Sequence, residues 1–102
     1  MNKQQEKAAR QQLFTKAGTY LKKKRLEHSY SLKDIADRVG CKAQFICNIE
    51  RGKAFPPMQV MRGMIEAYEI PEKEILGFLT DLQYSFFKQL YFEDGEKRRA
   101  QA

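Results

Sequence analysis

The sequence predicts an all-α protein with five helices, and three observations support this fold class. Apolar residues recur at helical spacing through most of the chain. Glycines and prolines stand where one helix must end and the next must begin. The last long segment repeats its large apolar residues at steps of three and four. A chain of 102 residues suffices for one compact domain with extensions at its ends.

The first predicted helix contains an apolar stripe that starts at Leu13, and the helix ends at about His28. Its apolar stripe has helical spacing and consists of Leu13, Phe14, Ala17, Gly18, Leu21 and Leu26. Residues 1–12 precede it as a polar extension rich in Gln, Lys and Ala. This extension either lengthens the first helix or frays.

Residues 31–52 predict two short helices joined by a tight turn. Ser31 is a good N-cap, and Asp34 three positions later completes a capping-box pattern. Gly40 ends the first of the two helices, because a left-handed backbone conformation is cheap only for glycine. The second helix, Lys42 to Arg51, is followed by another glycine. Two short helices joined in this way are typical of a helix-turn-helix.

Prolines mark the start of the two remaining helices. Pro57 can open a helix at its first turn, so we expect one from Met58 to about Glu69. Pro71 suits the start of the last helix, which we expect to extend from Glu72 to about Phe92. Acidic residues in its first turn favour the positive end of that helix.

The last predicted helix is more apolar than a small domain needs. One stripe contains Ile75, Leu79, Leu82, Phe86 and Leu90, and a second stripe contains Tyr84, Phe87 and Tyr91. An exposed patch of this size usually marks an interface. We therefore expect residues 80–92 to dimerise the protein, through an interface formed by Ile75, Leu79, Leu82, Phe86, Phe87, Leu90 and Tyr91. Alternatively, the helix folds back on the N-terminal extension. Residues 93–102 are charged, and we expect a disordered tail there.

The segment SLKDIADRVGCKAQFICNIERG, residues 31–52, resembles the helix-turn-helix of the lambda Cro and repressor-like family, also called the XRE family. The resemblance is carried by Ala36, Gly40, Ile46 and the closing IERG at residues 49–52. It extends upstream to LKKKR and downstream to KAFPP, and it covers roughly residues 14–79. It implies a five-helix lambda-repressor-like domain at residues 13–79. The apolar pattern of the last helix, and not the resemblance, predicts that this helix extends beyond Leu79.

The resemblance also implies sequence-specific binding to double-stranded DNA. The second helix of such a motif lies in the major groove with its N-terminal part at the base edges. The base-contacting positions implied here are Lys42, Ala43, Gln44 and Asn48. Gln44 and Asn48 share a helix face, and each can bond an adenine edge. The implied phosphate contacts are Ser31, Lys33, Arg51 and Lys53.

Two further positions follow from the same resemblance. In this family, an arginine at the place of Arg25 pairs with the glutamate of IERG, here Glu50. This ion pair is expected to hold the first helix against the second helix of the motif, which is called the recognition helix. The sequence departs from the family pattern at Leu32, where relatives often carry a glutamine that touches a phosphate.

The charge distribution fits a polyanionic partner at one end of the chain. The net charge is +6, and residues 1–30 alone carry eight basic and two acidic side chains. Residues 58–92 carry three basic and five acidic side chains. The positive part therefore contains or adjoins the helix-turn-helix, and the mildly acidic part lies beyond it.

The sequence offers no catalytic set, so we expect a protein that is not an enzyme. His28 is the only histidine and borders a loop. Cys41 and Cys47 are six positions apart and project from different helix faces, so they are not expected to form a disulfide within one chain. Their spacing is also not that of metal ligands, and neither a metal nor a cofactor is expected. No apolar run approaches the length that crosses a bilayer, and the N-terminus lacks the apolar core of a signal peptide. A cytoplasmic protein is the expectation.

Three functions remain open from the sequence. The first is a transcription regulator that binds a palindromic operator as a homodimer. The second is the antitoxin of a toxin–antitoxin pair, with the last helix binding the toxin. The third is a protein-binding helical module that does not read DNA. The operator sequence, and whether such a regulator represses or activates, are not readable from these residues.

Overall fold

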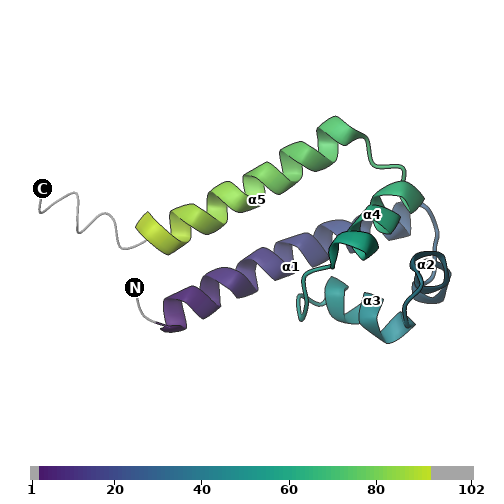
Figure 1. Cartoon of the computed structure of the whole chain (residues 1–102), viewed down its shortest axis with the longest axis horizontal. Coiled ribbons are helices and arrows are strands. Elements are labelled where there is room, and N and C mark those ends of the chain that lie inside the picture. Colours follow the sequence, from purple (N-terminus) through teal and green to yellow (C-terminus); the bar gives the residue numbers. More distant parts are fainter. Residues whose placement is uncertain (1–2, 93–102) are drawn as a thin grey trace, which may run out of the picture.

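The structure is a computed structural model that describes residues 3–92. Within these residues it contains five α-helices and no strand, which confirms the predicted all-α class (Figure 1). The helices are α1 (Lys3–Glu27), α2 (Leu32–Val39), α3 (Ala43–Glu50), α4 (Met58–Ala67) and α5 (Glu72–Phe92). The predicted tail at residues 93–102 lies outside the described residues.

Helix α1 is longer than the apolar stripe predicted. It begins at Lys3, ten residues before Leu13, so the described part of the polar extension continues the helix. Ala9 in this extension is buried. Helices α1 and α5 lie side by side and run in opposite directions, and the end of α5 returns to the beginning of α1 (Figure 1). Of the two alternatives for residues 1–12, a lengthened first helix is therefore the one observed for residues 3–12.

The capping signals of α2 act as the sequence predicts. The Ser31 hydroxyl oxygen accepts a hydrogen bond from the backbone N–H of Asp34 at 3.0 Å. The Asp34 carboxylate accepts one from the Ser31 backbone N–H at 2.8 Å, which completes the capping box and lowers the pKa of Asp34. Gly40 ends α2 with a φ of 77° in the left-handed region. These contacts fix where α2 begins and where the chain turns into α3.

Helix α4 ends two residues earlier than expected. It begins at Met58 after Pro57, as predicted, but its last residue is Ala67. Tyr68 caps the helix, and Glu69 has a φ of 51°. That left-handed residue reverses the chain toward Pro71 and α5, so the helix cannot continue to Glu69.

The core lies among the first four helices and the start of α5. Its most completely buried large side chains are Leu21, Ile35, Ile46, Ile49, Met64 and Tyr68. Leu32, at the position where the family pattern has a glutamine, packs against this core. The departure from the pattern therefore adds an apolar contact beneath the helix-turn-helix.

The apolar residues of α5 divide between two faces. Ile75 and Leu82 are only 4% and 6% exposed because they face the rest of the chain. Tyr84 and Phe87, by contrast, are 68% and 42% exposed. Two of the seven residues predicted to meet a partner chain, Ile75 and Leu82, are thus covered within a single chain. Leu82 lies near Thr15 and Tyr20 of α1, and Ile75 belongs to the main core, so these two residues pack beside the N-terminal extension and not on it.

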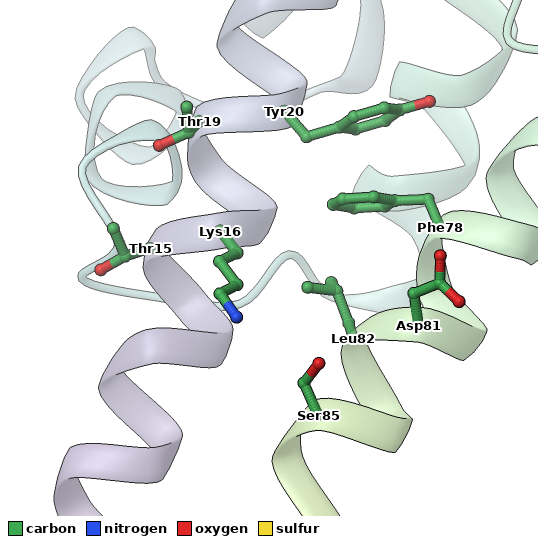
Figure 2. A pocket seen from close by; sticks show the side chains of 8 residues that line it. All are labelled: Thr15, Lys16, Thr19, Tyr20, Phe78, Asp81, Leu82 and Ser85. Carbon is green, nitrogen blue, oxygen red and sulfur yellow. The ribbon is translucent and has the colours of Figure 1, made fainter.

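A groove of about 460 Å³ lies between α1 and α5 (Figure 2). Its upper end is closed by Tyr20 and Phe78, whose rings stack with centroids 3.9 Å apart. Beside the stack, the Glu74 carboxylate accepts hydrogen bonds from the Tyr20 hydroxyl and, at 2.7 Å, from Lys24 Nζ. These contacts tie the first turn of α5 to α1.

Among residues 3–92, no helix has the length and apolar content needed to span a membrane.

Candidate nucleic-acid interface

The C-terminal half of α3 rests directly on the backbone of α1. A Cβ atom placed on Gly18 would lie 2.3 Å from the carbonyl oxygen of Ile49 and 2.7 Å from that of Glu50. Such distances are impossible for a real Cβ, so only glycine permits this approach. Gly18 thereby fixes how closely α3 packs on α1.

Arg25 and Glu50 form a two-pronged ion pair between the same two helices. Arg25 Nε donates to Glu50 Oε2 at 2.7 Å, and Arg25 Nη2 donates to Glu50 Oε1 at 2.9 Å. The two side chains are only 9% and 5% exposed. Arg25 Nη1 also donates to the carbonyl oxygen of Tyr30 at 2.8 Å, which holds the connection into α2. The hydrogen bonds to Glu50 raise the pKa of Arg25, so the guanidinium is firmly cationic.

The outer face of α3 presents amide side chains to solvent. Gln44 is exposed, Asn48 is half-buried, and Gln44 Nε2 donates to Asn48 Oδ1 at 3.0 Å. Lys42, the N-cap residue, is exposed at the start of the helix. Ala43 is half-buried and packs against the core, so its methyl group is only partly available to a ligand. These are the four positions that the resemblance assigned to base contacts.

The four positions assigned to phosphate contacts lie at the two ends of the motif. Ser31 is exposed, and its hydroxyl oxygen already accepts the capping hydrogen bond of α2. Lys33 is exposed and paired with Asp37 at 2.9 Å, and the hydrogen bond to Asp37 raises the pKa of Lys33. Arg51 and Lys53 are exposed where the chain leaves α3. Ser31 and Lys33 are thus partly engaged within the protein.

Sequence reasoning missed the role of Gln11. Its Nε2 donates to the carbonyl oxygen of Gly52 and to Thr15 Oγ1, both at 3.0 Å. Gln11 therefore holds the turn after α3 against α1. Helical spacing could have revealed it, because Gln11, Thr15 and Gly18 follow one another at steps of four and three on one face.

The cysteines and acidic residues form no metal-binding group among residues 3–92. Cys41 and Cys47 are half-buried, unpaired thiols, and burial raises the pKa of Cys41.

A comparison with known protein families supports the helix-turn-helix arrangement of α2 and α3. A helix-turn-helix family model matches residues 21–75, which include α2, α3, α4 and the part of α1 that contains Arg25. No curated protein and no solved structure was found to match the chain. The matched segment covers more than half of the chain and all of the helix-turn-helix. The chain therefore belongs to the Cro/repressor-like (XRE) family of helix-turn-helix proteins, which bind DNA in transcription regulation.

Proposed function

We propose that the protein is a transcription regulator that binds a palindromic operator in double-stranded DNA as a homodimer. The observation that carries the proposal is the amide pair on α3 that is formed by the exposed Gln44 and the half-buried Asn48. The opposite side of this helix is held by Gly18 and by the Arg25–Glu50 pair. A rigidly held helix that offers two adenine-reading side chains is suited to direct readout in the major groove.

Base reading by this pair requires an exchange of hydrogen bonds. In the free protein, the two amides bond each other at 3.0 Å, which keeps both side chains on the same side of α3. Each amide can replace that bond with a bidentate contact to an adenine edge. Lys42, Arg51 and Lys53 lie at the two ends of the helix and supply positive charge for the flanking phosphates. The basic residues position α3, and the amides provide sequence preference.

The dimer is proposed to form through the exposed face of α5. Leu76, Tyr84, Phe87 and Tyr91 are exposed on this face, and the half-buried Leu79, Phe86 and Leu90 lie beside it. Ile75 and Leu82 are excluded, because they are covered by α1 and the core. An apolar face of this kind is costly in water, and a second copy related by two-fold symmetry is the simplest cover. A dimer would place two recognition helices on one DNA duplex.

Selection of bound sequences from random duplex DNA tests the proposal. We expect an inverted repeat with half-sites about one helical turn, roughly 10 base pairs, apart. A dimer that contacts about eight phosphates should give a log-log salt slope near −7. Recovery of no preferred sequence, or of a single unrepeated half-site, would contradict operator binding by a dimer. Failure to bind any duplex at low salt would instead favour a helical module that binds only protein.

Sedimentation of the purified protein tests the dimer separately. The wild type should be a dimer, and the double variant Tyr84→Asp with Phe87→Asp should be a monomer with unchanged helix content. Ser85→Asp is the matched control, because Ser85 lines the groove toward α1 and should leave the dimer intact (Figure 2). A wild-type monomer would contradict self-association.

The aromatic face also supports a second function, the antitoxin of a toxin–antitoxin pair. In that case, the same face of α5 binds a different protein. The supporting result is a wild-type monomer that forms a complex with a protein encoded beside it. That complex should be lost in the Tyr84→Asp and Phe87→Asp variant and kept in Ser85→Asp.

A further inference from the structure

Successive turns on one face of α1 contact the C-terminal end of α3 and the turn that comes after it. Arg25 bonds Glu50, and Gly18 touches the carbonyl groups of Ile49 and Glu50. One turn earlier in α1, Thr15 lies against Gly52, and Gln11 donates to the Gly52 carbonyl oxygen at 3.0 Å. This face of α1 is therefore aligned with α3 and with the turn from which Arg51 and Lys53 project.

The next residue on that face is Lys7, four positions before Gln11. Helix α1 is continuous from Lys3, so Lys7 lies about 5–6 Å beyond Gln11 along the helix axis. Lys7 is exposed and makes no ion pair with any residue that the structure describes. Its neighbour Arg10, in contrast, pairs with Glu6 at 3.3 Å. Lys3, one further turn away on a similar side, is also exposed.

The N-terminal half of α1 continues past the end of α3 (Figure 1). When α3 lies in the major groove, the sugar-phosphate backbone borders the groove on both sides. Arg51 and Lys53 project from the turn at Gly52, and Lys7 lies on the face of α1 that packs against this turn. Three basic residues, Lys3, Lys7 and Arg10, lie in this part of α1. An unpaired lysine there can release a counterion from a phosphate.

We propose that Lys7, with Lys3 one turn beyond it, binds the DNA phosphates that flank the base pairs read by α3. The N-terminal extension of α1 thereby adds a backbone contact outside the helix-turn-helix. This inference rests on the proposed binding of DNA by α3. It assigns to the extension a role that the helix-turn-helix does not require.

Lys16 provides a matched control on the same helix. It follows Lys7 by nine residues, which is half a turn out of phase, so it lies on the opposite side of α1. Figure 2 shows Lys16 in the groove between α1 and α5, together with Leu82 and Asp81. Both lysines are exposed and carry the same charge, but only Lys7 lies on the face that follows α3.

The experiment measures binding to the selected operator as a function of salt for the wild type, Lys7→Ala, Lys7→Arg and Lys16→Ala. Lys7→Ala should make the log-log slope shallower by about 1 per DNA-bound chain and weaken binding to all sequences alike. The ratio of wild-type affinity to Lys7→Ala affinity should fall about 3.5-fold per chain when the salt concentration rises from 50 to 200 mM. Lys7→Arg should keep the wild-type slope, and Lys16→Ala should match the wild type. Thermal unfolding of all four proteins should coincide, because both side chains are exposed.

Shortened duplexes provide a second measurement. Trimming the operator from its ends should abolish the difference between the wild type and Lys7→Ala once the flanking phosphates are removed. The effect of Asn48→Ala should persist on the same short duplex. A wild-type slope for Lys7→Ala, or an equal loss for Lys16→Ala, would overturn the inference while leaving the function of α3 intact. A wild type that binds no duplex DNA would overturn both.

Discussion

Arg25 in α1 and Glu50 at the end of α3 form a bidentate ion pair that is almost completely removed from solvent. The two bonds are 2.7 and 2.9 Å long, and a third bond links Arg25 to the Tyr30 carbonyl oxygen. The pair therefore joins α1, the connection into α2 and α3. Loss of one partner leaves the other charge buried without compensation, which is costlier than loss of the whole pair.

We predict that Arg25→Ala and Glu50→Ala each lower the free energy of unfolding by about 3 kcal/mol. The double variant should lose much less than the sum of the two single losses, because it leaves no isolated buried charge. Urea unfolding of the wild type, the two single variants and the double variant measures this double-mutant cycle. Additive losses would show that the two side chains do not interact in solution. Lys33→Ala and Asp37→Ala are the control, since that pair is exposed and should barely change the midpoint.

Gly18 should tolerate no larger residue. In Gly18→Ala, the new Cβ would collide with the backbone of Ile49 and Glu50, which cannot move without displacing α3. We expect a loss of about 3 kcal/mol or more in unfolding free energy and weaker operator binding. Gly77→Ala is the control, because a Cβ there meets nothing within 4 Å. That change should stabilise α5 by about 0.5–1 kcal/mol. Equal stability of the two variants would contradict the close approach at Gly18.

Gln44→Ala and Asn48→Ala should each weaken operator binding by about 1–3 kcal/mol. Each change should also relax sequence preference at one position of each half-site, because an adenine edge loses its bidentate partner. Competition binding with operators altered at single base pairs measures both effects. Gln59→Ala, an exposed glutamine of α4, should bind like the wild type. Unchanged sequence preference in both α3 variants would refute the assignment of α3 as the reading helix.

Stability should fall at acidic pH partly through Glu74. The hydrogen bond from Lys24 and then that from Tyr20 lower the pKa of Glu74 below its ordinary value of 4.5. A folded-state pKa that is depressed stabilises the fold above the unfolded-state pKa. This contribution disappears as the pH falls through the folded-state pKa.

Unfolding measured from neutral to acidic pH tests this sign. Glu74→Gln should be less stable than the wild type at neutral pH, and the difference should shrink as the pH drops below about 4.5. Glu72→Gln is the control, because Glu72 lies in the same turn of α5 and makes no ion pair with a described residue. A constant difference between Glu74→Gln and the wild type across the range would contradict the pairing of Glu74 with Lys24.

Local sequence signals predicted much of the fold. The capping box at Ser31, the left-handed Gly40 and the start of α4 after Pro57 all occur where expected. These signals act within a few residues, through hydrogen bonds and backbone conformations that neighbouring residues largely determine. The motif within residues 31–52 was sufficient to indicate the helix-turn-helix family. In contrast, α4 ends early because Glu69 adopts a left-handed conformation that its residue type does not favour.

The sequence by itself determined the helices, the family and which residues of α5 share a face. Only the tertiary structure decided that Ile75 and Leu82 face the chain and that Tyr84 and Phe87 face solvent. Periodicity identifies two apolar stripes on a helix, but it does not say which stripe meets a neighbour. That choice depends on the antiparallel packing of α5 on α1, which joins residues fifty or more positions apart. Ala9 is also buried, within a segment whose polar composition gave no sign of it.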